Sequence, residues 1–287
     1  MCSNNAYSIT RWSRSRAPLL ESVPRAYVLT LRTSDRLLAA HAARLKLLCS
    51  QTFVQVNDGF RMGDKPSYID STAKDLIHAY QNVCRDCAHI DGPVLIMEDD
   101  AMLFEADASV FREIDAFVKT KAFDVYSLAS IGPFDRSNDQ GPHRMFRSIM
   151  GFSQAIIWSR ASRASLLSQD LRRDTHIDVH ILSKFTRKFT YERPVVVQLF
   201  PTTENMETWC IRCDDEDCFE PMLVKAWQWT LQRVLYLDRT PDGWRTIYLF
   251  NTHAESVCKF VSVSIAVAII ALLHNAKKKS ARLSSVS

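Results

Sequence analysis

The sequence predicts an α/β fold in which a mostly parallel, Rossmann-like central sheet is flanked by helices. Short apolar runs alternate with stretches of helical periodicity through the middle of the 287-residue chain. One run, residues 94–97, is apolar at every position, which is typical of a strand buried on both faces of a sheet. The hydrophobic content of 47% and the charged content of 24% are those of an ordinary globular protein.

The elements are expected in a regular order. Apolar runs bounded by turn residues predict strands at 26–31, 52–56, 94–97, 123–129, 155–158 and 194–200. The turn signal Asp58-Gly59 closes the second of these strands. Between these strands, helical spacing predicts three helices, whose apolar stripes are Leu38, Ala42, Leu45 and Leu48; Ala73, Leu76, Ile77, Tyr80, Val83 and Cys87; and Val110, Ile114, Phe117 and Val118. A further helix is expected at 222–237.

Charge and glycine usage exclude several classes of function. The net charge of +4 is too small to indicate a nucleic-acid partner, and no RNP, zinc-finger or basic-helix pattern is present. Neither G-x-G-x-x-G nor G-x-x-x-x-G-K-[ST] occurs, so the fingerprints of a dinucleotide site and of a P-loop are missing. We therefore expect no nucleic acid among the partners.

Three consecutive acids, Glu98, Asp99 and Asp100, follow the buried run 94–97. Ligands of open α/β sheets bind beyond the carboxyl ends of the strands. On an extended chain Glu98 and Asp100 point to one side and Asp99 to the other. Two carboxylates on one side offer oxygen ligands to a hard divalent cation, which can in turn hold a diphosphate. The alternative is a solvated acidic loop.

Six segments resemble, in order and spacing, one known family. They are "AYVLTLRTSDRLLAAHAARLKLL", "VQVNDGF", His78 twenty residues before Glu98, "MGFSQAIIWSRASRASLL", "HIDVHIL" and "VVVQ". Together they resemble glycosyltransferase family 25, the lipopolysaccharide and collagen galactosyltransferase group, over residues 25–205. The sequence departs from the family pattern at Ile77, where Ser is usual, and at Thr30, where Asn is usual.

The resemblance implies a GT-A fold and metal-dependent, inverting transfer of a sugar such as galactose. The donor would be a nucleotide-diphosphate sugar, with a UDP-sugar expected, and the acceptor a hydroxyl of a glycan, a lipid-glycan or a protein. Asp100 and Glu98 are then expected to hold the metal, Mn²⁺ or alternatively Mg²⁺, with His180 as a further candidate ligand. Asp99 is expected to meet the ribose or the sugar, and Asp178 to be the catalytic base.

The remaining candidates each have a structural alternative. Arg36 is expected to pair with phosphate, or to be an ordinary surface arginine. Asp58 is expected to bind the nucleoside, or to cap its own turn. His78 is an acceptor-side candidate, or a core histidine. His176 and His180 flank Asp178 at i±2, so on a strand the three side chains would share a face.

The ends of the chain differ from its middle. We expect a basic disordered tail at 1–24, the GT-A catalytic domain at 25–205, an extension packed on it at 206–256, and a hydrophobic segment with a basic tail at 257–287. Residues 260–273 are uncharged, and this length is short of the roughly 20 residues that a bilayer span needs. We expect membrane association through this segment with a cytosolic catalytic domain. The alternative is a buried final element of a soluble cytoplasmic protein.

The eight cysteines support a rival interpretation. Cys84 and Cys87, with Cys210, Cys213 and Cys218, have the spacing of structural zinc ligands. Cys84 and Cys87 also fit the apolar stripe of a helix, where they would pack as small hydrophobic side chains. The alternatives to an active transferase are a catalytically inactive homologue that binds sugar or nucleotide, and a membrane-anchored interaction protein with an incidental acidic loop.

Overall fold

The structure is a computed structural model. It describes residues 6–32, 34, 46–60, 62, 64–104, 107–129, 136–146, 154–173, 176–199, 229–237 and 242–247. The chain forms two compact units, Met1–Arg245 and Thr246–Ser287, and all but two residues of the second lie outside the described ranges. Everything below concerns the first unit.

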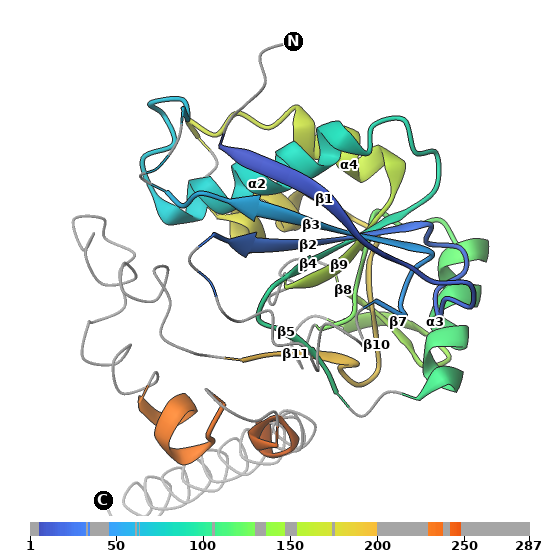
Figure 1. Cartoon of the computed structure of the whole chain (residues 1–287). Helices are drawn as coiled ribbons and strands as arrows, with labels where there is room; N and C mark the ends of the chain where they lie inside the picture. The colour runs from blue at the N-terminus through green and yellow to red at the C-terminus, as the bar shows by residue number, and fades with distance from the viewer. Residues whose placement is uncertain are drawn as a thin grey trace, which may run out of the picture. The chain divides into compact units, whose positions relative to one another are not determined.

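The first unit is a mixed α/β fold around a nine-stranded sheet (Figure 1). The order of strands is β1-β3-β2-β4-β9-β6-β10-β8-β7. Strand bounds are β1 Tyr7–Arg14, β2 Arg25–Leu31, β3 Gln51–Asn57, β4 Val94–Glu98, β6 Val125–Ser127, β7 Arg136–Gln140, β8 His143–Phe146, β9 Ala155–Trp158 and β10 Lys188–Tyr191. β2, β3, β4, β6 and β10 run in one direction, whereas β1, β8 and β9 run against it. The expected central sheet is therefore present, with β9 reversed between β4 and β6.

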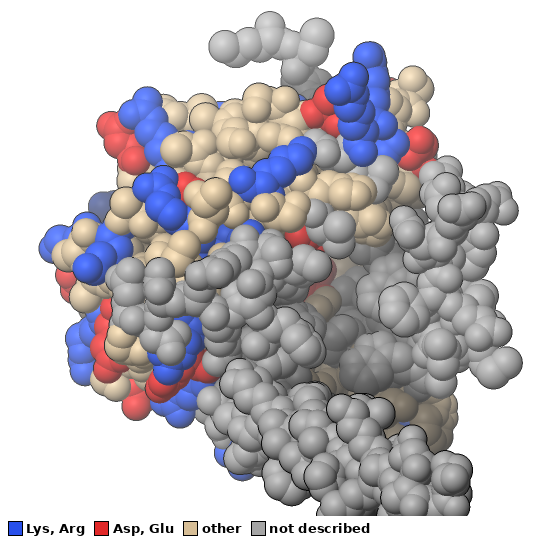
Figure 2. All heavy atoms as spheres, turned by 180° about the vertical axis from the view of Figure 1, so that it is seen from behind, with Lys and Arg blue, Asp and Glu red and all other residues tan. Residues whose placement is uncertain are grey.

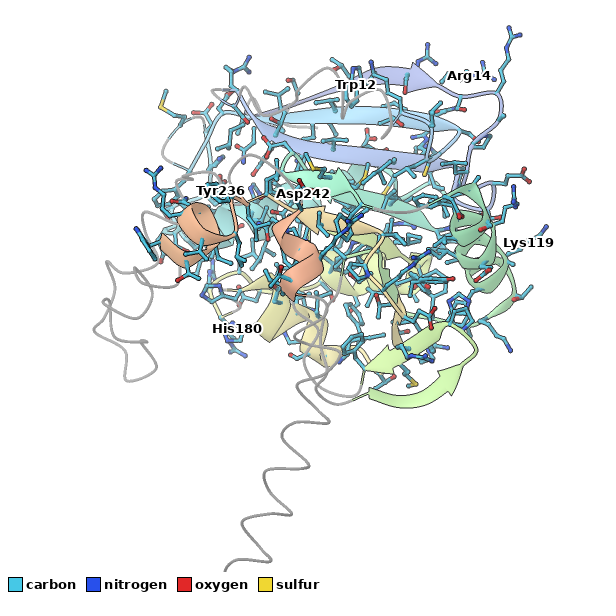
Figure 3. The ribbon with its side chains drawn as sticks, turned by 90° about the horizontal axis from the view of Figure 1, so that it is seen from below. Trp12, Arg14, Lys119, His180, Tyr236 and Asp242 are labelled. Carbon is cyan, nitrogen blue, oxygen red and sulfur yellow. The ribbon has the colours of Figure 1, made fainter. Side chains whose placement is uncertain are left out.

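The expectation that residues 1–24 form a disordered tail is wrong for residues 6–24, among which Leu20 and Val23 are buried in the core. Residues Tyr7–Arg14 form β1, which pairs antiparallel with β3 at the edge of the sheet. Tyr7 and Ile9 pack against the core on the α2 side of the sheet, with the exposed Ser8 between them, and Trp12, beyond an irregularity in the pairing, packs against the core on the other side. Figure 3 marks this edge with Trp12 and Arg14. Because the strand carries two arginines and no long apolar run, its alternation was overlooked.

Helices cover both faces of the sheet (Figure 1). Helices α2 (Thr72–Asp86) and α4 (Arg160–Leu167) contribute to the core on one face, and α3 (Ala108–Thr120) contributes to the core on the other. Side chains of β4 alternate between these two cores, and four of its five residues are buried. The continuous apolar run 94–97 is thus explained by burial on both faces, as expected.

A second, two-stranded sheet lies beside the carboxyl end of β4. It pairs β5 (Ala101–Leu103) antiparallel with β11 (Val196–Gln198). The strand predicted at 194–200 is therefore shorter than expected and belongs to this small sheet. Only Asp99 and Asp100 separate β4 from β5, so the chain passes from the large sheet to the small one through the acidic triplet.

Surface charge on the visible face of Figure 2 is mixed, with Lys and Arg interspersed among Asp and Glu. Among the described residues, no helix is both long enough and apolar enough to cross a membrane. The predicted membrane segment, 257–287, lies outside the described residues, as do most of the first predicted helix and residues 206–228 of the predicted extension.

Candidate functional site

The acidic triplet occupies the turn after β4. Glu98 is the last residue of the strand, and its backbone N–H donates to the carbonyl of Gln154 at 2.8 Å, which extends the pairing of β4 with β9. Its side chain accepts a hydrogen bond from the hydroxyl of Tyr80, on helix α2, at 3.2 Å. Glu98 therefore lies on the α2 side of the sheet, at the carboxyl edge where ligands of α/β folds bind.

Asp178 joins the triplet although it lies eighty residues further along the chain. Burial raises the pKa of Glu98 well above its ordinary value, and the nearby carboxylates of Asp100, Asp178 and Asp99 raise it further. Burial likewise raises the pKa of Tyr80, and Glu98, Asp178 and Asp100 add to that effect. We call Glu98, Asp100 and Asp178 the carboxylate cluster. Its members repel one another because they share a site with little water.

The route by which Asp178 reaches the cluster differs from the prediction. Residues Ile177–Ile181 form a π-helical turn and not a strand. His176 and His180 therefore lie on a common side, with ring centroids 6.1 Å apart, and His180 Nδ1 accepts from the backbone N–H of His176 at 3.4 Å. Figure 3 shows His180 at the outside of the fold. The expectation that His180 shares a strand face with Asp178 is wrong, because two residues along a helical turn point in nearly opposite directions.

Asp99 turns toward the end of β2. Its Oδ2 accepts from the hydroxyl of Thr30 at 2.8 Å and from the hydroxyl of Ser34 at 2.7 Å. Thr30 is one of the positions at which the sequence departs from the family pattern. Here its hydroxyl fixes the carboxylate that was expected to meet the ribose or the sugar.

Asp100 is held by the small sheet. It is 6% exposed, and its Oδ2 accepts from Gln198 Nε2, at the end of β11, at 2.8 Å. The backbone N–H of Leu199 donates to the carbonyl of Asp100 at 3.1 Å. The indole N–H of Trp244, a side chain with 1% exposure, donates to the carbonyl of Gln198 at 2.6 Å. Asp100 is thus connected through Gln198 to Trp244.

The other donor-side candidates lie across the same edge of the sheet. Asp58 follows β3 and pairs with Arg32, which follows β2, at 2.6 Å. The turn itself is held by Asn57, whose Oδ1 accepts from the N–H of Gly59 at 3.0 Å, and Gly59 has the positive φ that favours glycine. Asn57 therefore caps this turn, which was the structural alternative considered for Asp58. Arg36 lies outside the described residues.

His78 is placed away from the carboxylate cluster. It is 2% exposed, and its Nδ1 lies 2.8 Å from the hydroxyl of Tyr7 on β1. Burial lowers the pKa of His78 to about 4, and the charge of Arg85 adds to this effect. The side chain has the surroundings of a packed core histidine, on a different side of α2 from Tyr80.

The described residues contain no group of three or more His, Cys, Asp or Glu side chains arranged to hold a metal ion. Cys84 and Cys87 are buried in the core between α2 and the sheet. Burial raises the pKa of the Cys87 thiol to about 11, and burial also raises that of Cys84. Both pack as small hydrophobic side chains, and their proposed zinc partners, Cys210, Cys213 and Cys218, lie outside the described residues.

Three residues of this site were not predicted as functional: Tyr80, Gln198 and Trp244. Tyr80 was expected only as part of an apolar helical stripe. Gln198 had a weak signal, because it is the first polar residue after the apolar run 195–197. Trp244 was expected only to pack, as part of the extension 206–256, and its contact with Gln198 depends on how that distant segment folds.

No protein-family model matches the chain, and no curated protein matches it. Two solved structures share part of its architecture. A crystal structure of A197 from STIV has 11% identity and a TM-score of 0.37, covering 61% of this chain and 83% of that one. A crystal structure of UDP-glucose pyrophosphorylase complexed with UDP-glucose has 10% identity and a TM-score of 0.36, covering 60% and 73%. Likeness of this degree carries no argument about function.

Proposed function

We propose that this protein is a metal-dependent glycosyltransferase of GT-A type that takes a sugar from a nucleotide-diphosphate donor. The observation that supports the proposal is that Asp178 and Asp100 both lie close enough to Glu98, at the carboxyl edge of β4, for their charges to raise its pKa. The sequence resemblance independently assigns these three residues to one site. A solvated acidic loop would not bring a half-buried carboxylate from eighty residues away to its neighbourhood.

The carboxylate cluster fits a divalent cation. Burial and mutual repulsion disfavour its negative charges, and a cation offsets both. Hard cations such as Mg²⁺ are commonly held by one or two carboxylates, with substrate phosphates and water completing the shell. A site of this kind needs no group of three protein ligands. We propose that Asp100 and Glu98 hold Mn²⁺ or Mg²⁺, which when bound stabilises the negative charge of the leaving diphosphate.

Three further residues would each have a separate role in binding or catalysis. We assign Asp99, which Thr30 and Ser34 hold, to accept a hydrogen bond from the ribose or the sugar. We assign Asp178 to take the proton of the acceptor hydroxyl, because it reaches the cluster from a separate element. Gln198 holds the Asp100 carboxylate in place, so that less rearrangement is needed when the donor binds.

A thermal-shift screen of nucleotide sugars with and without Mn²⁺ tests this proposal. We expect UDP-sugars to raise the unfolding midpoint, and Mn²⁺ to be required for most of the shift. Binding without release of UDP would indicate an inactive sugar-nucleotide-binding homologue. If no nucleotide or nucleotide sugar shifts the midpoint under either condition, the proposal is wrong.

A further inference from the structure

One buried polar side chain beside the carboxylate cluster has no assigned role. Gln154 directly precedes β9 and is 2% exposed. Its carbonyl accepts from the backbone N–H of Glu98 at 2.8 Å, and the neighbouring rung pairs Met97 with Ala155. Gln154 is therefore the cross-strand neighbour of Glu98, at the carboxyl edge of β4.

The side chain of Gln154 lies on the same face of the sheet as that of Glu98. Along β9, Ala155 belongs to the core on the α3 side and Ile156 to the core on the α2 side. Alternation then puts Gln154 on the α2 side, where Glu98 meets Tyr80.

The amide nitrogen of Gln154 is buried, and within the described part of the chain it has no hydrogen-bond partner. A buried donor with an unmade bond disfavours the folded state, so such a group calls for an explanation. The indole nitrogen of Trp158 is in the same condition, but Trp158 pairs with Val94 at the opposite end of β4 and packs against the rings of Tyr80 and Phe185. The position of Gln154 beside the acids distinguishes it from this core residue.

The order of the strands orients a bound donor. Across the carboxyl edge, Asp58 follows β3, Asp99 is anchored to β2 by Thr30, the carboxylate cluster follows β4, and Gln154 adjoins β9. In the proposed function the nucleoside lies toward Asp58 and the diphosphate at the cluster. The sugar then lies on the side of β9.

We propose that Gln154 Nε2 donates a hydrogen bond to a hydroxyl of the donor's sugar, making Gln154 a determinant of which nucleotide sugar is bound. This inference rests on the proposed function and adds the residue that recognises the sugar. A bound hydroxyl supplies the acceptor that the buried amide nitrogen otherwise lacks.

The test compares Gln154→Met with Gln81→Met. Methionine is close to glutamine in length and has no N–H donor. Gln81 is the matched control, because it is also buried, at 4% exposure, but its Nε2 donates to the carbonyls of Leu166 and Gln169 at 3.0 and 3.1 Å. Gln81→Met removes an amide that makes hydrogen bonds and should lower the unfolding midpoint by roughly 2–6 °C. Gln154→Met removes an amide nitrogen without a partner and should leave the midpoint unchanged or raise it.

Binding is measured by calorimetry with UDP, UDP-galactose, UDP-glucose and UDP-N-acetylglucosamine in Mn²⁺. We expect Gln154→Met to bind UDP as the wild type does, and to bind the preferred UDP-sugar roughly 3- to 10-fold more weakly. Gln81→Met should bind both as the wild type does. Undiminished UDP-sugar binding by Gln154→Met, or a fall in its midpoint equal to that of Gln81→Met, overturns the inference while the proposed function stands. A wild type that binds neither UDP nor any UDP-sugar overturns both.

Discussion

Replacing Asp100 with asparagine distinguishes the effect of the acidic residues on stability from their effect on ligand binding. The amide has nearly the shape of the carboxylate, and its oxygen can still accept from Gln198 Nε2, which lies 2.8 Å from Asp100 Oδ2. What disappears is one of the two charges that contribute most to the raised pKa of Glu98. We therefore expect Asp100→Asn to stabilise the metal-free protein.

The magnitude follows from the linkage between pKa and stability. Glu98 has a folded-state pKa above its unfolded value, so the folded protein binds more protons, and stability is lost as pH rises from the unfolded value through the folded one. For each pKa unit by which the substitution lowers the pKa of Glu98, the free energy of unfolding rises by about 1.4 kcal/mol. We expect a gain of about 1–2 kcal/mol in the free energy of unfolding at pH 7.5, and a smaller gain at pH 4.5.

Urea denaturation in EDTA at these two pH values measures the effect. Asp91→Asn is the control, since Asp91 makes an exposed ion pair with Arg160 at 2.6 Å and should change stability by less than about 0.5 kcal/mol. In Mn²⁺ and UDP the order should reverse, because only the wild type gains stability from the ligand. An Asp100→Asn protein that is less stable than the wild type in EDTA, or that keeps Mn²⁺-dependent UDP binding, would refute this reasoning.

Three further predictions concern Asp178, Trp244 and, away from the site, His143. Asp178→Asn should lower turnover on the order of 10²–10⁴-fold with UDP affinity unchanged, and lost UDP affinity with a normal rate would make Asp178 a binding residue. Trp244→Phe removes the donor to the Gln198 carbonyl; calorimetry should show Mn²⁺-UDP binding weakened roughly 3- to 10-fold, whereas unchanged affinity would separate Trp244 from the site. Burial lowers the pKa of His143 to about 4, so the folded protein keeps this side chain neutral, and the free energy of unfolding falls as pH drops from 6.5 toward 4. Denaturation at pH 7 and pH 4.5 should show that the free energy of unfolding of His143→Gln falls by roughly 2 kcal/mol less than that of the wild type over this interval. Equal decreases in the two proteins would contradict a lowered pKa of His143.

The parts of the fold that were predictable are those in which local pattern and burial agree. Residues 94–97 form a strand buried on both faces, and residues 26–31 another, so their apolar runs were sufficient. Strand β10 was missed because its first residue, Lys188, is fully buried although lysine normally indicates a solvated position. Strand β5 was missed because three residues show too little alternation to be recognised.

For the candidate site, the acidic residues could be proposed from the sequence, but the residues that contact them could not. Glu98 and Asp100 were proposed because acids follow a buried strand, and Asp178 only because of the family resemblance. Asp178 lies near Glu98 because residues Ile177–Ile181 form a helical turn, whereas a strand was considered there on sequence grounds. Tyr80 and Gln198 contact the acids through tertiary packing, and no short-range pattern encodes such contacts.

Release of UDP from UDP-sugars tests the central claim most directly. Full-length protein is incubated with UDP-galactose, UDP-glucose or UDP-N-acetylglucosamine, with Mn²⁺ or with EDTA, and free UDP is measured. The account predicts release of UDP from at least one donor by the wild type in Mn²⁺, none in EDTA, and none by Asp100→Asn in either. Release in EDTA equal to that in Mn²⁺, or full release by Asp100→Asn, would contradict it.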